Sequence, residues 1–248
     1  VTPWLTAPNT DAPPIPAQNV QITSSGYNYV NLSWDASAIG DLAGYKVYYD
    51  TDASGYPYAN SVDVSNVTTY NLTGLNTGSP YYIAVTTYDT DGNESWYSAE
   101  AQATPVPDTL NVPVSYTTIQ SALTAASEGD VVLVQPGTYT ENIIWPETNG
   151  IKLISAGDSS NTIIDGGGNT SVITIDLSST TIDSNTIIDG FKITNGFAST
   201  KGGGIQLDSV SNMLIKNTLV ENNSSSFYGG GMSCFYSSPN IINSSIKN

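Results

Sequence analysis

The sequence NTIIDG at residues 161–166 recurs at residues 185–190, 24 positions further along the chain. GGGI at residues 202–205 recurs as GGGM at residues 229–232, at a step of 27. Each period contains short runs of Ile, Val and Leu that are broken by Gly, Asn and Ser. Such a period is typical of a solenoid whose coils bury their apolar side chains against one another. The repeat therefore predicts a parallel β-helix from residue 151 onward.

A series of asparagines follows the same repeat. Asn195, Asn222 and Asn248 succeed one another at steps of 27 and 26. Side-chain amides at equivalent positions of stacked coils can hydrogen-bond from one coil to the next. We expect these three residues to form a structural ladder inside the turns.

One short helix is predicted before the repeat. Ile119, Leu123 and Ala126 lie at helical spacing behind a Ser/Thr cap in residues 115–118. The segment GDVVLVQPGTY at residues 129–139 follows as a strand and a sharp turn. This order of helix, strand and degenerate coils resembles the right-handed β-helix superfamily of pectate lyases, pectin methylesterases and many surface proteins. The resemblance implies that the helix caps the N-terminal end of the coil stack.

Residues 19–103 have a different pattern, in which short alternating runs are separated by clusters of Gly, Asn, Asp and Ser. Three runs place apolar or aromatic side chains on one face of a strand: Val30, Leu32 and Trp34; Tyr45, Val47 and Tyr49; and Tyr81, Ile83 and Val85. Seven strands fit in this length. The pattern predicts an antiparallel β-sandwich.

Four motifs of this segment resemble a fibronectin type III domain: PAQNV at 16–20, LSW at 32–34, GYKVYY at 44–49 and LTGLNTGSPY at 72–81. The resemblance implies that Trp34 is the core tryptophan and Tyr81 the corner tyrosine, both with structural roles.

The expected fold class is all-β, a fibronectin type III sandwich followed by a right-handed parallel β-helix with a short N-terminal capping helix. The expected organisation is a Pro-rich linker at 1–16, the sandwich at 17–105, a linker at 106–112 and the β-helix at 113–248. The last coil is in register with the repeat and has no following cap. We therefore expect the β-helix to continue in a longer chain or to be covered by another subunit.

The charge composition excludes several classes of function. The 248 residues contain six Lys, 22 Asp and Glu, and neither Arg nor His, for a net charge of −16. Without His there is no Ser-His-Asp or Cys-His relay and no His-ligated metal. So acidic a chain would be repelled by nucleic acid and by anionic lipid, and no segment is apolar enough to insert in a membrane. The expected partner is a polysaccharide or a cell-surface glycan.

No catalytic residue is predicted. YTTIQ at 116–120 and GTYTE at 137–141 resemble two motifs of the pectin methylesterases, but these are structural motifs, and the catalytic ones have no counterpart. Asp165 and Asp189 are expected at equivalent positions of neighbouring coils, where they could form the carboxylate pair of a glycoside hydrolase, although a role in turns is favoured.

Lysine could also supply the base of a lyase. Lys192 and Lys216 lie on coils that carry Asp189 and Glu221, so a lysine base is compatible with the composition. Solvated surface charge is the favoured interpretation.

Two aromatic pairs, Phe227-Tyr228 and Phe235-Tyr236, are the candidate carbohydrate-binding residues. Adjacent residues of a strand point to opposite faces, so one member of each pair is expected to be exposed and able to stack on sugar rings. Packing under a neighbouring loop is the alternative. Cys234, the single cysteine, is expected to be a buried structural thiol.

One loop has the oxygen donors of a metal site. Asp89, Asp91, Asn93 and Glu94 surround a glycine, as in a calcium loop, but the bidentate Glu of an EF-hand is absent. A plain turn is favoured. No cofactor is therefore predicted, and calcium, if it binds, would be peripheral to stability.

The favoured function is a modular protein of the cell exterior or cell surface, of bacterial type, that acts in adhesion, glycan binding or structural presentation. One alternative is a polysaccharide lyase or glycoside hydrolase whose catalytic coils lie beyond residue 248. Another is a self-assembling structural subunit that associates through the open end of the β-helix.

Overall fold

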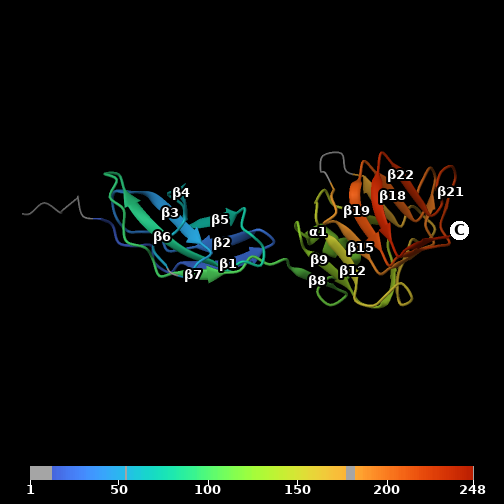
Figure 1. Cartoon of the computed structure of the whole chain (residues 1–248), viewed down its shortest axis with the longest axis horizontal. Helices are drawn as coiled ribbons and strands as arrows, with labels where there is room; N and C mark the ends of the chain where they lie inside the picture. Colours follow the sequence, from blue (N-terminus) through green and yellow to red (C-terminus); the bar gives the residue numbers. More distant parts are fainter. Residues whose placement is uncertain (1–12, 54, 177–181, 248) are drawn as a thin grey trace, which may run out of the picture. The chain divides into compact units, whose positions relative to one another are not determined.

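The computed structural model describes residues 13–53, 55–176 and 182–247. The chain divides into two compact units, Val1–Val106 (unit 1) and Pro107–Asn248 (unit 2), which are drawn in Figure 1. Each unit has a hydrophobic core of its own. Within the described ranges no helix has the length and apolar character needed to cross a membrane.

Unit 1 is an antiparallel sandwich of two sheets. One sheet has the order β1-β2-β5 and the other the order β4-β3-β6-β7. The strands are β1 (Gln21–Gly26), β2 (Tyr29–Ser33), β3 (Leu42–Asp50), β4 (Asn60–Ser65), β5 (Thr69–Thr73), β6 (Tyr81–Asp89) and β7 (Ala101–Ala103). The predicted seven-stranded sandwich is therefore confirmed.

The core of unit 1 consists of the predicted alternating residues. Trp34 is buried and its ring lies 5.5 Å from that of Tyr45, a distance typical of packed aromatic pairs. The hydroxyl of Tyr81 accepts a hydrogen bond of 3.0 Å from the backbone N–H of Asn76, five residues upstream. This bond ties the loop before β6 to the sandwich, so both residues have the structural roles expected of them.

Unit 2 consists mainly of three parallel sheets. The first has the order β23-β19-β15-β12-β9-β8, the second β10-β13-β16-β20-β24 and the third β11-β14-β18-β22. Strands of the first sheet are β8 (Thr109–Val112), β9 (Val131–Val134), β12 (Lys152–Ser155), β15 (Ile187–Asp189), β19 (Ser211–Lys216) and β23 (Ser238–Ile242). Those of the second are β10 (Gly137–Thr140), β13 (Thr162–Asp165), β16 (Lys192–Thr194), β20 (Leu219–Val220) and β24 (Ser245–Ile246). Those of the third are β11 (Ile143–Ile144), β14 (Ile173–Asp176), β18 (Ile205–Asp208) and β22 (Met232–Phe235).

From β9 onward the chain visits the sheets in a fixed order, first, second and third, and then returns to the first. A short parallel pair, β17 (Phe197–Ala198) and β21 (Ser224–Ser225), lies between the second and third sheets in this order. Ile205 of β18 pairs with Met232 of β22, which confirms the predicted step of 27. Successive turns of the chain, here called coils, thus stack in register.

The expectation that the two NTIIDG segments occupy equivalent positions of neighbouring coils is wrong. Asp165 lies in the second sheet, where it pairs with Thr194, whereas Asp189 lies in the first sheet and pairs with Ile154 and Lys216. NTIIDG therefore occurs at two different positions of the coil. The reason is that a short apolar strand ending in an Asp-Gly turn suits either sheet.

Residues 109–112, expected to be part of a linker, form strand β8. This strand pairs with β9 in parallel and extends the first sheet. Leu110 and Val112 are buried in the core of unit 2, because alternate residues of a strand point to the same face. The prolines on either side favour an extended linker, but the apolar alternation between them makes the segment a strand.

Helix α1 (Ile119–Ala125) lies where the sequence predicts it. Thr118 is the N-cap, and its side chain accepts a hydrogen bond of 3.0 Å from the N–H of Ser121. The Glu141 carboxylate accepts two more from the N–H groups of Ile119 and Gln120, at 2.9 and 3.0 Å. These bonds satisfy N–H groups of the first turn that have no partner inside the helix. The helix packs against β8, β9 and β11.

Glycines of neighbouring coils stack closely in unit 2. A Cβ atom on Gly203 would lie 2.6 Å from the carbonyl oxygen of Gly230 and 2.8 Å from the carbonyl carbon of Ser224. Both of these are backbone atoms of the next coil. Only glycine fits at this position.

Candidate functional site

A groove of about 540 Å³ follows the turns at the ends of strands in the second sheet. Its walls carry mainly polar side chains and one aromatic ring, contributed by Thr140, Asp165, Asn195, Phe197, Asn222 and Ser224. Thr140 and Asp165 are the last residues of β10 and β13, and Asn195 directly follows β16. Adjacent parallel strands lie about 4.8 Å apart, so the groove presents one polar group per coil at this spacing.

Some of these side chains are bound within the turns, and others are available to a ligand. Asp165 accepts hydrogen bonds of 2.9 Å from the N–H of Gly167 and from the side-chain amide of Asn195. Among the described residues, none forms a side-chain hydrogen bond with Thr140, Asn222 or Ser224. The groove therefore has three free polar groups, together with the ring of Phe197, which is 40% exposed.

The predicted asparagine ladder is only partly present. Asn195 and Asn222 occupy equivalent turns with a φ of 56° each, and the N–H of Asn195 donates to the carbonyl of Asn222 at 3.2 Å. The side chain of Asn195, however, bonds Asp165 and not the next asparagine. Asn248 lies outside the described residues. The hydrogen bond that links Asn195 and Asn222 is therefore a backbone bond and not a side-chain one.

The neighbouring Asn223 is the residue whose side chain links coils. It is buried, its Oδ1 accepts from the N–H of Gly196 at 2.8 Å, and its Nδ2 donates to the carbonyls of Ile193 and Glu221 at 2.9 and 3.0 Å. The sequence pattern does not predict this role. The one signal is that Asn222 and Asn223 stand side by side, which does not reveal which of them points inward.

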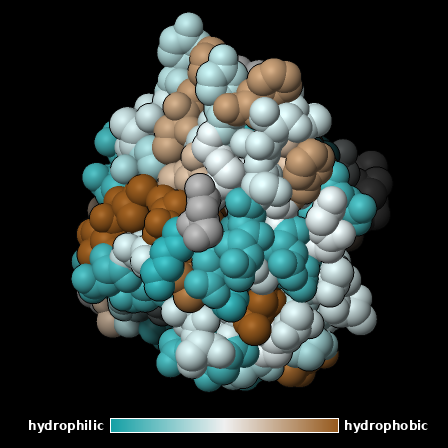
Figure 2. Space-filling model, turned by 90° about the vertical axis from the view of Figure 1, so that its right-hand side faces the viewer, coloured by the Kyte–Doolittle hydropathy of each residue, from teal (hydrophilic) through white to brown (hydrophobic). Residues whose placement is uncertain are grey.

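The predicted carbohydrate-binding aromatics are all on the surface. The exposed fractions of Phe227, Tyr228, Phe235 and Tyr236 are 77%, 71%, 48% and 81%. Each pair thus has an exposed member, as expected, and its second member is exposed too, because Phe227 and Tyr228 precede β22, and Phe235 ends it where no described strand packs over it. Figure 2, which views the molecule from the right-hand side of Figure 1, shows brown hydrophobic patches separated by teal hydrophilic ones.

Cys234 is also exposed, which corrects the expected buried thiol. It pairs with the buried Leu207 of the preceding coil, but no described residue covers it from the other side. Partial burial of the thiol raises its pKa above the ordinary value. Such a thiol is mostly protonated at neutral pH and is a weak nucleophile.

The lysines considered as bases are engaged in ion pairs. Lys192 lies 2.6 Å from the carboxylate of Glu221, and Lys216 lies 3.1 Å from that of Asp189. The hydrogen bond from Lys192 holds the pKa of Glu221 below its ordinary value. Each pair joins strands or turns of adjacent coils. These contacts fit the favoured interpretation as surface charge.

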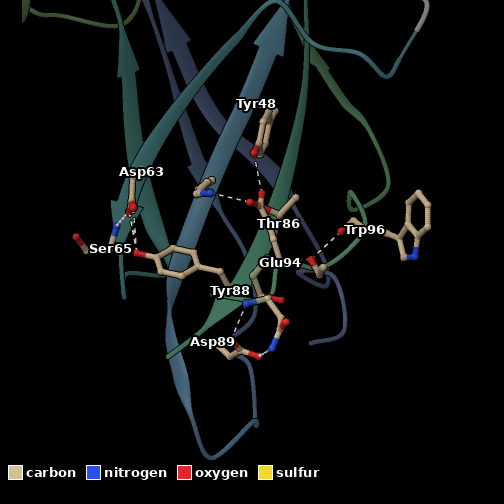
Figure 3. Close-up of polar contacts among 12 residues, drawn as sticks. Tyr48, Asp63, Ser65, Thr86, Tyr88, Asp89, Glu94 and Trp96 are labelled. Atoms are coloured by element: carbon tan, nitrogen blue, oxygen red, sulfur yellow. Dashed lines mark hydrogen bonds and ion pairs between the residues drawn. The ribbon is translucent and has the colours of Figure 1, made fainter. Parts of the chain in front are cut away.

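The four residues of the predicted metal loop do not converge. Oδ1 of Asp89 accepts from the N–H groups of Asp91 and Asn93 at 3.0 and 2.8 Å, and Oδ2 accepts from the Asn93 side chain at 3.0 Å. Hydrogen bonding from Asn93 lowers the pKa of Asp89 below its ordinary value. Glu94 turns to the sheet instead (Figure 3). In the described ranges no three His, Cys, Asp or Glu residues are grouped so as to hold a metal ion.

Glu94 is the centre of a polar network on the outer face of the β4-β3-β6-β7 sheet (Figure 3). Its carboxylate accepts hydrogen bonds from Lys46 at 2.6 Å and from Tyr48 and Thr86 at 2.7 Å each. Burial alone would raise the pKa of Glu94, but the bonds from Lys46, Thr86 and Tyr48 outweigh it and hold the pKa below its ordinary value. The ionised form is therefore the stabilising one.

We expect a pH-dependent contribution of Glu94 to the stability of unit 1. Because its folded pKa is depressed, this contribution is present above the unfolded pKa of about 4.3 and is lost as the pH falls through the folded pKa. The free energy of unfolding of Glu94→Gln should lie below that of the parent at pH 7, and the difference should shrink below about pH 4. Denaturant unfolding at a series of pH values measures it. A difference that is independent of pH would contradict the assignment.

Four tyrosines gather on the same sheet face, which the sequence did not reveal. The ring of Tyr97 lies 4.9 Å from that of Tyr48, 5.2 Å from Tyr58 and 5.5 Å from Tyr56. We call these four residues the tyrosine cluster. They come from β3, from the segment before β4 and from the segment after β6. Only the folded sheet brings such distant positions together.

Comparison with known proteins identifies unit 1. Residues 13–104 match the family model described as Fibronectin type III domain. These residues form a fibronectin type III domain. The match begins four residues before the expected boundary at residue 17, so the start of the domain includes the end of the Pro-rich segment.

Curated relatives are similar to part of the chain. An alpha-amylase of Niallia circulans is 34% identical over 119 residues, which are 47% of this chain and 8% of the amylase. Contactin-6 of Mus musculus is 34% identical over 87 residues, 33% of this chain and 8% of contactin-6. The chain thus spans less than a tenth of the length of these relatives.

Solved structures of similar domains cover a little over a third of the chain. A Fn3-like protein from Clostridium thermocellum is 31% identical, with 39% of this chain and 97% of that chain covered and a TM-score of 0.32. A human fibronectin type III domain is 21% identical, with 39% and 90% covered and a TM-score of 0.34.

Proposed function

We propose that the chain is part of an extracellular modular protein in which the fibronectin type III domain accompanies a right-handed parallel β-helix, and that the β-helix binds polysaccharide. The repeated order of three parallel sheets in unit 2 supports the β-helix. The fibronectin type III domain of the chain, and the similarity of part of the chain to contactin-6 and to a bacterial alpha-amylase, support an adhesive or binding role outside the cell. A bacterial origin stays a prediction.

The groove of unit 2 is the observation that carries glycan binding. Hydroxyl and amide groups of Thr140, Asn222 and Ser224 can exchange hydrogen bonds with sugar hydroxyls, and the exposed ring of Phe197 can stack on a pyranose. These polar groups repeat along the coils, so each successive sugar of a linear chain would meet one of them. This fits an extended polysaccharide.

The charge of the groove favours a neutral glycan. Its lining contains the carboxylate of Asp165 and, within the described lining, no Lys. A uronate chain would therefore meet a negative charge with no cation to offset it. The same described lining has only one carboxylate, whereas glycoside hydrolysis generally needs two. Binding without cleavage is the function these groups support best.

We expect a glycan array to give at least one neutral hit for the parent protein that is lost with the variants Phe197→Ala and Asn222→Ala. Both side chains line the groove and lie on the surface, so the fold should survive. Tyr228→Ala and Tyr236→Ala remove the exposed aromatics near β22 and serve as the matched comparison.

The array result distinguishes between two candidate glycan sites, the groove and the exposed aromatics near β22. Loss with Tyr228→Ala and Tyr236→Ala alone would move the glycan site to the aromatics predicted from the sequence. No hit with the parent, or equal binding by all four variants, would contradict the proposed function. Unchanged thermal unfolding of each variant is the folding control.

Self-association through the last described coil, which carries β23 and β24, stays a prediction. Ile241, Ile242 and Ile246 are 44%, 49% and 44% exposed there.

A further inference from the structure

The tyrosine cluster of unit 1 is built on one face of strand β3. Lys46, Tyr48 and Asp50 alternate along this strand and therefore point to the same side of the sheet. Tyr56 and Tyr58 come from the segment before β4, and Tyr97 from the segment after β6. The cluster lies in a different unit from the glycan groove, so ligand binding at the cluster is independent of the proposed function.

The rings of the cluster are held in place. Tyr97 meets Tyr48 edge-on at 4.9 Å and Tyr58 at 5.2 Å, which are favourable distances for aromatic pairs. The hydroxyl of Tyr48 donates to Glu94 at 2.7 Å and that of Tyr58 to Glu100 at 2.8 Å. Tyr56 packs against Tyr97 yet remains 72% exposed. The result is a rigid aromatic surface with an open ring at its edge.

Negative charge surrounds these rings. Asp50 is only 5% exposed; its Oδ2 accepts from the N–H of Ala59 at 3.2 Å, and its Oδ1 is buried without a hydrogen-bond partner. The carboxylate of Glu100 lies beside Gly55, next to Tyr56 in the chain. Burial raises the pKa of Tyr58, and the charges of Glu100 and Asp50 raise it further, which places both carboxylates near this ring.

The positive charge of Lys46, near the cluster, is already engaged in an ion pair. Lys46 is paired with Glu94 at 2.6 Å and lies over the ring of Tyr88. Among the described residues, three carboxylates, Asp50, Glu94 and Glu100, thus adjoin the cluster against this one ammonium. A buried carboxylate oxygen without a donor is costly, and a bound cation would lower that cost.

We propose that the tyrosine cluster binds an organic cation of the quaternary ammonium class. Such a cation carries methyl groups that pack on aromatic rings and a charge that the ring faces and the carboxylates attract. It needs no hydrogen-bond acceptor, and here the Glu94 carboxylate is already occupied by three donors. A divalent metal fits less well, because the described carboxylates do not group as metal ligands.

Choline is the probe that tests this site. Titrated into the full chain, it should shift the NMR amide signals of residues 48–58 and 94–100. The neutral tert-butyl isostere of choline, in which carbon replaces nitrogen, should shift them at least about threefold more weakly at equal concentration, because it lacks the charge. Salt should weaken the choline response, since it screens exposed charges.

Variants locate the binding surface. Tyr56→Ala removes the exposed ring and should lower the choline affinity at least about threefold. Tyr56→Phe retains the ring and should retain the affinity of the parent protein. Glu100→Gln should lower the affinity by removing charge. Tyr236→Ala, an exposed tyrosine of unit 2, is the control and should change nothing.

Two results with the parent protein would overturn the proposal. One is the absence of choline-dependent shifts in the parent protein, and the other is an equal response to choline and its neutral isostere. Retention of full affinity by Tyr56→Ala would likewise remove the cluster as the site. Shifts of the same signals with a neutral sugar and none with choline would assign the surface to glycans instead.

Discussion

Gly203→Ala is expected to destabilise unit 2 by about 3 kcal/mol or more, enough to unfold its later coils. The added Cβ would lie 2.6 Å from the carbonyl oxygen of Gly230 and 2.8 Å from the carbonyl carbon of Ser224. That oxygen accepts a hydrogen bond of 3.0 Å from the N–H of Gly204, so moving it breaks the contact between coils. Thermal unfolding followed by circular dichroism measures the loss.

Gly137→Ala is the matched control in the same unit. Gly137 lies in β10, and Gly203 lies in the turn before β18; a Cβ on Gly137 would be 3.5 Å from the ring of Tyr139, an ordinary contact. Its melting temperature should stay close to that of the parent. If both substitutions cost the same, close stacking of the glycines is not what constrains Gly203.

Phe191→Ala should also cost about 3–5 kcal/mol of unfolding free energy. Phe191 is completely buried in the core of unit 2, at the short turn between β15 and β16, where its carbonyl accepts a bond of 2.8 Å from Leu219 of the next coil. Removing the ring leaves a cavity among the side chains of adjacent coils. Denaturant unfolding at neutral pH measures the change.

Phe191→Leu separates the cavity from other effects, because it restores most of the lost volume and should recover more than half of the lost stability. Phe197→Ala removes the same side chain from a partly exposed position and should cost much less. An equally small effect of Phe191→Ala would mean that this core repacks freely.

The fold was largely predictable because its periodicities are simple. Alternation in Val30, Leu32 and Trp34 predicts a half-buried strand whatever its partners are, and the step of 27 places Ile205 over Met232. The step of 24 led to a wrong prediction of equivalent positions, because Asp165 and Asp189 share a local sequence but lie in different sheets. Strand and turn propensities are local, whereas the choice of sheet depends on the whole coil.

The candidate sites were harder to predict because they depend on long-range contacts. Tyr48 and Tyr97 are far apart in the sequence, and no local pattern relates them. Glu94 has the spacing of a loop ligand, but its carboxylate reaches across the sheet to Lys46. Asp89 is a turn residue because its neighbours supply N–H donors at short range. Hydrogen bonds between neighbours in the sequence could be predicted, whereas contacts between side chains from distant segments could not.

The regular stacking of the coils has a consequence for how this kind of gene can evolve. Asn195 and Asn222 stand at equivalent turns one repeat apart, and each contributes one polar group to the groove. Duplication of one such unit would insert a coil that pairs with its neighbours as the present ones do. The groove would then lengthen by one step, so the number of repeats in the gene sets the length of the groove.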